Sequence, residues 1–444
     1  MLSSFSGAFM HFRFAFVFIT LACFMCLPAY GQPSNDVKRE LDSLRSQLDS
    51  LKALVATGIT DEMLDKVAER LERRMQQLEE KIDASSRATT PIVFNPRTTA
   101  FLNFSARMDD RAVFDEEGIA EISNKMFLRS VELDLRAPVD PYAEGIIILA
   151  VEDEAGTGFA LDPEEAYGIM KRLPILESAP LGLKLKVGKF RAPFGQNNRL
   201  HMHDLPWTTR PLVVSKFLGT EHGDFFESGY NPTGVDLDFF LPTIIPGTTA
   251  EMNIDMLRGG EIGLTQGHGG DQPAWLAHLT VSADWSNEHL LVLGASGYHN
   301  YGIATTSMVG VDVLYKWSPS ERRDSRSFVV GGEAFSGWHA FPNSGLGTVT
   351  MTPTGWFGYI QYQLSYSLYA GIRVDRVEEP ADESKRTQAL SAYISYYTTE
   401  FLRIRVGVDH RQSDLQTLDE LTTANLEINF VFGAHPTEPY WVNR

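Results

Sequence analysis

The segment LRIRVGVD, residues 402–409, alternates aliphatic and polar side chains without a break. In an extended strand, Leu402, Ile404, Val406 and Val408 would share one face, and arginine, glycine and aspartate the other. This period of two indicates a β-strand with one apolar and one polar face. An amphipathic helix needs apolar residues three or four positions apart, so this stretch is not helical.

The same period recurs from residue 98 onward, for example in residues 181–187, 235–239 and 426–430. We count about sixteen such segments, most of roughly 9 to 12 residues, the length that a tilted strand needs to cross a bilayer. An even number of antiparallel strands closes a barrel with both ends on one side. The sequence therefore predicts an all-β fold: a transmembrane antiparallel β-barrel of about sixteen strands over residues 98–432.

Soluble β-sandwiches and propellers also contain alternating strands, so two further patterns decide between these folds and a membrane barrel. Connections alternate in length, as in the long one near 108–124 and the short turn at 137–141. Aromatic residues gather at segment ends, as with Tyr315 and Trp317. Membrane barrels combine long outer loops and short turns with aromatic girdles at both interfaces. Both patterns favour the membrane barrel.

The N-terminus, residues 1–31, has the pattern of a signal peptide. Arg13 precedes the apolar run 15–27, and the small residues Ala29 and Gly31 follow at the spacing that signal peptidase recognises. The run is shorter than the ~20 residues of a spanning helix. Both cysteines lie inside it, so we expect neither disulfides nor cysteine-ligated metal in the exported chain.

Residues 32–83 have a helical period instead. Apolar residues recur at alternating spacings of four and three along two seams, at 37–55 and 68–82, with charged residues between them. Heptad spacing of this kind is typical of an α-helical coiled coil. The alternative is an amphipathic helix packed on its own barrel, but dense charge outside the seams favours self-association. We expect a periplasmic stalk that joins a homotrimer, and then a linker at 84–97.

The longest connection, residues 191–228, lies between the fifth and sixth predicted strands. A loop of this length in a compact domain usually has a function. Its stem and first half read KVGKFRAPFGQNNRLHMHDLPWTTRPLV, residues 186–213. This stretch resembles the Gly-Lys-Phe-Arg, Phe-Gly and Arg-Pro-Leu signature of the phosphate-selective porins, the O and P porins. The strand period and the N-terminal coiled coil also suit that family.

The resemblance implies a trimeric, anion-preferring channel whose long loop folds into the lumen and whose basic side chains pass oxyanions such as phosphate. The local charge agrees, because basic residues far outnumber Glu177 and Asp204 between Lys171 and Lys216. Arginine and lysine can replace water around phosphate in a narrow pore. The candidate anion-binding residues are Lys184, Lys186, Lys189, Arg191, Arg199 and Arg210.

The polar faces of the other predicted strands carry more acidic than basic residues, among them Asp236, Asp312, Asp375 and Glu427. Two interpretations are open. A basic constriction can dominate selectivity despite an acidic wall, since charges act most strongly where the pore is narrowest and driest. Alternatively, most of these charges pair with one another across the lumen wall.

His201 and His203 flank Met202 beside Asp204. In an extended segment both imidazoles point to one side, and such a pair next to a carboxylate can bind zinc or copper. The alternative is a pair of histidines that packs within the loop. Serine, histidine and aspartate residues form no nucleophile elbow or other catalytic frame, so we expect neither an enzyme nor a cofactor.

Together these patterns predict a passive diffusion channel for small hydrophilic solutes in the outer membrane, in contact with lipid. Two alternatives stay open: a metal-binding or cation-leaning channel, and an envelope tether whose stalk touches peptidoglycan. Energised uptake would need a plug domain, and only the stalk and linker precede the barrel. The net charge of -18 argues against nucleic acid as a partner. The last strand ends at Phe432, before a C-terminal tail at 433–444.

Overall fold

The computed structural model describes residues 96–112, 126–153, 159–173, 178–219, 229–260, 262–265, 267–286, 288–319, 325–343, 347–415, 420–433 and 441–442. They all belong to one compact unit, Pro96–Arg444. The predicted signal peptide, the coiled-coil stalk and most of the linker lie outside the described residues.

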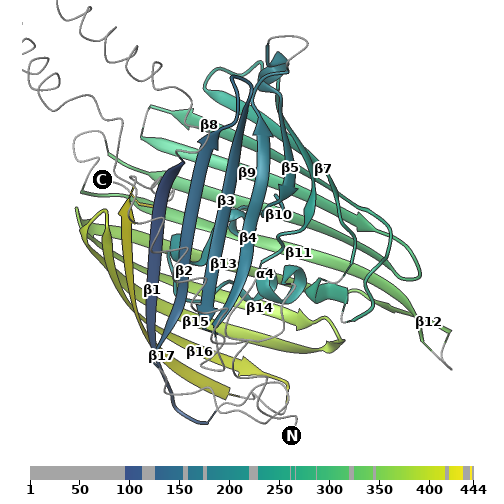
Figure 1. The fold of residues 1–444 in the computed structure, drawn as a ribbon. Helices are drawn as coiled ribbons and strands as arrows, with labels where there is room; N and C mark the ends of the chain where they lie inside the picture. Colours follow the sequence, from purple (N-terminus) through teal and green to yellow (C-terminus); the bar gives the residue numbers. More distant parts are fainter. Residues whose placement is uncertain are drawn as a thin grey trace, which may run out of the picture. The chain divides into compact units, whose positions relative to one another are not determined.

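The described chain forms one antiparallel sheet (Figure 1). Its strands are β1 Arg97–Asp109, β2 Met126–Pro138, β3 Ala143–Asp153, β4 Phe159–Met170, β5 Lys184–Lys189, β6 Thr233–Leu241, β7 Thr248–Leu257, β8 Ala274–Trp285, β9 His289–Asn300, β10 Thr305–Trp317, β11 Phe328–Asn343, β12 Gly347–Met351, β13 Thr354–Ser365, β14 Leu368–Glu379, β15 Asp382–Thr399, β16 Leu402–Ser413 and β17 Glu420–Gly433. The described helices are η1 Pro180–Gly182, η2 Asn197–Arg199, η3 Met202–Asp204, α4 Leu212–Leu218 and η4 Gly263–Thr265.

Sixteen of these strands close into a barrel. β1 pairs with β2 on one side and with β17 on the other, so first and last strands meet. β12 stands outside the ring, because it pairs with the end of β11 while β11 also continues the ring by pairing with β13. The predicted antiparallel barrel of about sixteen strands is confirmed.

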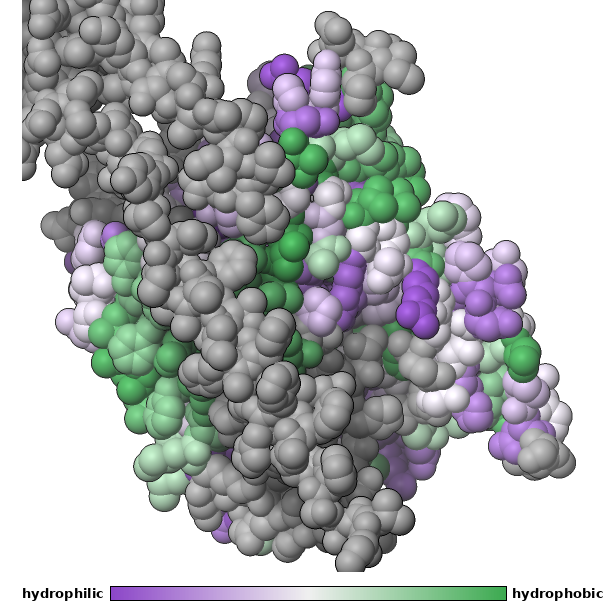
Figure 2. All heavy atoms as spheres, in the orientation of Figure 1, coloured by the Kyte–Doolittle hydropathy of each residue, from purple (hydrophilic) through white to green (hydrophobic). Residues whose placement is uncertain are grey.

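The two faces of the strands differ as their alternation predicts. On β16, Val406 and Val408 are 54% and 46% exposed, whereas Arg403 and Arg405 between the aliphatic positions are buried inside. Figure 2 shows hydrophobic residues over the outer face of the strands at the left of the view. The described helices include none that is long and apolar enough to cross a membrane.

The two ends of the barrel carry different connections. β1 begins and β17 ends at the same end of the barrel, since the two strands pair antiparallel from Thr99 and Gly433. Short turns gather at this end, such as residues 139–142, 366–367 and 400–401. The connections 110–125, 190–232 and 258–273 join strands at the other end. We call these the short-turn end and the long-loop end.

Candidate functional site

The described part of the connection from β5 to β6, residues 190–219 and 229–232, lies inside the ring of strands and packs against the inner wall. Its apolar side chains share one buried cluster with wall residues such as Phe335 and Tyr359. The Trp207 and Tyr359 rings meet edge to face with centroids 4.7 Å apart. From this loop the buried members are Phe190, Ala192, Phe194, Leu205, Trp207, Leu212, Val213, Val214, Phe217, Leu218 and Tyr230. Burial of this apolar surface holds the loop in the lumen.

Glycines in the wall make room for the loop. A Cβ on Gly310 of β10 would lie 2.7 Å from the Phe194 ring, and one on Gly355 of β13 would lie 2.7 Å from Val213. Larger residues at these two positions would push the loop away from the wall. The wall sequence is therefore matched to an inward loop.

Acidic wall residues hold the backbone of the loop. Oε1 of Glu333 on β11 accepts hydrogen bonds from the backbone N–H groups of Gln196 and Asn197, at 2.9 and 2.7 Å. It also accepts one from the Asn197 side-chain amide at 2.6 Å. On β14, Asp375 accepts from the Leu212 backbone N–H at 2.9 Å. Four donors of the loop thus find their acceptors on two wall residues, and loss of either acceptor would leave buried donors without a partner.

Basic wall residues hold the same loop from another side. Guanidinium groups of β2, β14 and β16 donate to backbone carbonyls of the loop: Arg129 to Thr208 at 2.6 Å, Arg373 to Thr209 at 2.6 Å, and Arg405 to Trp207 at 2.7 Å and Leu205 at 2.5 Å. Glu427 of β17 lies 2.6 Å from Arg403, 3.3 Å from Arg405 and 3.7 Å from Arg129. This buried carboxylate faces all three guanidinium groups and balances one of their positive charges.

Most of the basic residues that the sequence singles out contact acidic or carbonyl partners. The contacts are Lys184 with Asp238 at 2.9 Å, Lys186 with Asp236 at 3.3 Å, Arg191 with Glu164, Arg199 with the Asn253 amide oxygen at 2.9 Å, and Arg210 with the carbonyls of Asn197 and Leu200 at 2.9 and 3.0 Å. Lys189 ends β5 and is half-buried. The structure thus spreads these residues along the stem and loop, and most of them meet acidic or polar wall groups.

A polar hollow lies between the loop and the wall, toward the long-loop end. Its lining includes Arg107 of β1, Arg129 of β2, Arg411 of β16 and one acidic residue, Asp409. Loop residues Thr208 and Thr209 complete it, with Ser105, Phe127, Leu421, Thr423 and Asn425. Arg107 also pairs with Asp109 at 2.7 Å. No local sequence pattern marks these arginines as a group, because their convergence depends on barrel closure between β1 and β17.

The C-terminal tail contributes a fully buried residue inside the barrel, Trp441. Its indole N–H donates to the backbone carbonyl of Asp204 at 2.6 Å. Its ring contacts Tyr369 and Tyr397, with centroids 5.8 and 6.0 Å away. Tyr369 follows the 366–367 turn and Tyr397 precedes the 400–401 turn. Trp441 therefore occupies the lumen between the inward loop and the short-turn end.

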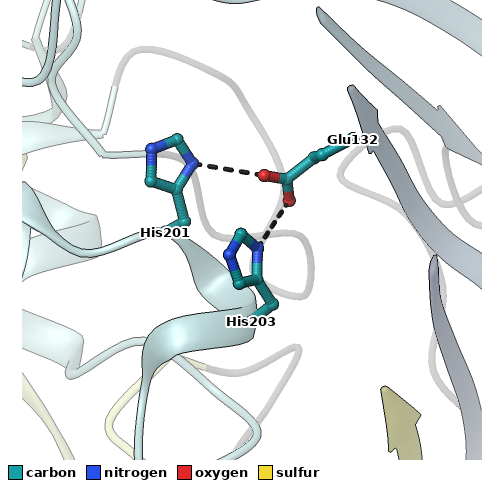
Figure 3. A group of neighbouring side chains, drawn as sticks. All are labelled: Glu132, His201 and His203. Atoms are coloured by element: carbon teal, nitrogen blue, oxygen red, sulfur yellow. Dashed lines mark hydrogen bonds and ion pairs between the residues drawn. The ribbon is translucent and has the colours of Figure 1, made fainter. Parts of the chain in front are cut away.

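The two histidines of the loop come together with Glu132 of β2 (Figure 3). Nδ1 of His201 lies 3.3 Å from Oε2 of Glu132, and Nδ1 of His203 lies 3.1 Å from Oε1. His201 also lies 3.0 Å from Glu164 and 2.8 Å from Glu165. Burial and the charge of Arg191 lower the pKa of His201, but hydrogen bonds to Glu132 and Glu165 outweigh them and raise it to about 9.

The closed barrel with a long loop inside its lumen has the fold of outer-membrane porins. The chain is similar in fold to the anion-selective porin from Comamonas acidovorans, with a TM-score of 0.51 and 9% identity over 76% of this chain and 99% of that one. For the outer membrane channel DcaP of Acinetobacter baumannii the TM-score is 0.49, with 12% identity over 76% and 97%. At such identities the likeness concerns the fold.

In sequence, the chain is similar to an uncharacterized protein of Aquifex aeolicus (strain VF5). The two are 25% identical over 360 residues, which cover 70% of each chain. No family model matches the chain.

Proposed function

We propose that this protein is an outer-membrane porin, a passive channel through which small hydrophilic solutes diffuse, with a preference for anions such as phosphate. The observation that carries the anion preference is the hollow lined by Arg107, Arg129 and Arg411 beside Asp409. Guanidinium groups bind oxyanions through paired N–H donors, and their field is stronger in a narrow site than in open water.

Three further observations support the proposal. The loop sequence resembles the signature of the phosphate-selective O and P porins. The fold is similar to a porin that is itself anion-selective. Several of the acidic wall residues also have partners inside the barrel, because Asp236, Asp375 and Glu333 contact the loop or its stem. Carboxylates that are paired in this way repel a passing anion less than unpaired ones.

The proposed assembly is a homotrimer in the outer membrane, with the predicted stalk at 32–83 in the periplasm, where peptidoglycan is a candidate partner. In this orientation the short-turn end faces the periplasm and the long-loop end faces outward, as in other outer-membrane barrels. A solute from outside would then reach the arginine-lined hollow where the inward loop meets the wall.

The test is the reversal potential of the purified protein in planar bilayers under a salt gradient. We expect the wild-type channel to pass anions better than cations. The double variant R107Q/R411Q removes two charges from the hollow and should lower the anion preference, and phosphate should then block chloride current less. R97Q is the matched control, because Arg97 is 75% exposed at the short-turn end.

The stem lysines are tested separately. K184Q/K186Q should also lower anion permeability if the six loop and stem residues line the anion path. A wild-type channel that prefers cations would overturn the anion proposal and favour the cation-leaning alternative.

A further inference from the structure

The group of Glu132, His201 and His203 is independent of the proposed channel function, because a diffusion channel needs no such cluster. It combines two imidazoles from the loop with one carboxylate from β2 (Figure 3). We propose that these three residues bind a divalent transition-metal ion such as Zn²⁺, which fastens the inward loop to the barrel wall.

The spacing of the ligand atoms fits such an ion. One atom of each residue lies within 4.8 Å of the other two. The two imidazole Nδ1 atoms lie 3.3 and 3.1 Å from the carboxylate oxygens of Glu132. Ligands about 2.0–2.2 Å from a tetrahedral zinc ion lie roughly 3.3–3.6 Å from one another. A metal ion can therefore enter between these atoms with only small side-chain movements.

The ligand set is buried and carries a carboxylate charge. Glu132 is 3% exposed and His203 is 5% exposed. Oε2 of Glu132 faces Nδ1 of His201 at 3.3 Å, and Oε1 faces Nδ1 of His203 at 3.1 Å. A buried carboxylate is costly unless hydrogen bonds or a cation compensate its charge. Zn²⁺ would supply such a cation.

The second nitrogen of each imidazole also faces a carboxylate. Nε2 of His201 lies 2.8 Å from Glu165, and Nε2 of His203 lies 3.5 Å from Asp204. Metal-binding histidines commonly donate this second N–H to a carboxylate, which orients the ring for the metal. The His203 ring is also stacked on Phe101, with centroids 4.0 Å apart. Glu164, 3.0 Å from Nδ1 of His201, is placed to give a fourth ligand.

The ion would join distant parts of the chain. Glu132 belongs to the wall and His203 to the loop, 71 residues later. Imidazole and carboxylate ligands suit zinc and copper better than calcium or magnesium, which prefer oxygen ligands alone. The competing explanation for the same three residues is a cluster held by ion pairs between protonated histidines and carboxylates, and such a cluster would bind no metal.

The experiment uses the full chain in detergent, stripped with a chelator and then equilibrated with Zn²⁺ alone. Bound zinc is measured by elemental analysis, and the affinity by calorimetric titration. We expect one ion per chain in the wild type. The isosteric variant E132Q and the variant H203A should lose that ion, and E165Q should bind it roughly 10- to 100-fold more weakly, as is usual for a residue that orients a ligand.

H278A is the matched control, because His278 is also buried on the wall but contacts Ser296 rather than a carboxylate; it should keep the ion. Cobalt in place of zinc gives a second measurement, since tetrahedral coordination produces an intense visible absorption that E132Q should abolish. No bound ion in the wild type, or equal zinc in wild type and E132Q, would overturn the proposal and leave the ion-pair cluster. Neither result depends on the reversal potential, so failure here is distinct from failure of the porin proposal.

Discussion

At the scale of the residue, the wall uses charge to organise its interior. Glu427 is fully buried and lies within 3.7 Å of three arginines, Arg129, Arg403 and Arg405. Buried charges cost free energy when they leave water and are kept only when opposite charges and hydrogen bonds compensate. One carboxylate thus permits several guanidiniums to stay buried, and two of these donate to the loop backbone.

We predict that E427Q lowers the free energy of unfolding by about 3 kcal/mol or more, because it removes the charge that compensates the buried arginines. Urea-induced unfolding in lipid vesicles, followed by tryptophan fluorescence, measures the change. E420Q on the same strand is the control. Its carboxylate is 54% exposed, so its effect should stay within about 0.5 kcal/mol. Equal unfolding free energies for the two variants would contradict the role of Glu427.

At the scale of the element, the inward loop is fixed by wall contacts on several sides. Glu333 accepts three hydrogen bonds at the turn of residues 196–197, next to Gly195. Gly195 has φ +65°, and a Cβ there would lie 2.3 Å from Glu333. Glycine is favoured here for both its conformation and the close approach.

We predict that E333A raises single-channel conductance and current noise, because three donors of the loop lose their acceptor and the turn loosens. The loss of each such bond is worth roughly 1–3 kcal/mol. Single-channel recording in planar bilayers is the measurement. D414A serves as control, since Asp414 is 53% exposed and pairs with Arg386 at the long-loop end. A conductance unchanged from wild type would mean that the other wall contacts suffice to hold the loop.

The strands could be predicted because their signal is local. In residues 402–409 each side chain's face follows from its position alone, whatever the rest of the chain does. The partners of the loop are not local: Glu333 and Asn197 are 136 positions apart. The sequence shows both the basic loop and the acidic wall, but which charges pair depends on strand register and barrel closure.

Each candidate site likewise has a part that the local sequence shows and a part that depends on distant contacts. His201 and His203 are visible as a pair two residues apart, whereas Glu132 joins them through the packing of the loop on β2. The arginine-lined hollow depends on β1 and β17 meeting. No period or spacing predicts that Trp441 enters the lumen, because the tail belongs to no alternating segment.

At the scale of the whole molecule, the predicted stalk at residues 32–83 leads to a prediction about the oligomeric state. We predict that deletion of residues 36–83 weakens the proposed trimer and leaves the barrel folded, because the predicted heptad seams would join subunits, whereas the barrel closes within one chain. Chemical cross-linking in detergent measures the oligomer, and heat-modifiable migration reports the folded barrel.

Point variants refine this test. L44D/L48D places charge in the first seam and should act like the deletion, whereas S43D/S46D places it outside the seam and should not. If the intact protein cross-links only as monomer, the seams do not join subunits.

The lumen of the barrel is narrowed by the inward loop and by Trp441. Trp441 connects the loop with the wall. Its indole N–H donates to the loop, and the side-chain amide of Gln361 on the wall donates to its carbonyl at 3.1 Å. Arg403 and Arg405 lie 5.7 and 5.8 Å from the centre of its ring. Aromatic, cation–π and hydrogen-bond contacts fix the position of this tryptophan side chain in the lumen.

We predict that W441A raises single-channel conductance while the barrel stays folded, because the large ring occupies lumen space and strand pairing closes the barrel without it. Planar-bilayer recording measures the conductance, and heat-modifiable migration checks folding. W285A is the control, since Trp285 ends β8 and is 45% exposed; its loss should leave conductance unchanged. If W441A conducts like the wild type, solutes pass the barrel along a path that avoids Trp441, and the inward loop alone limits the flow.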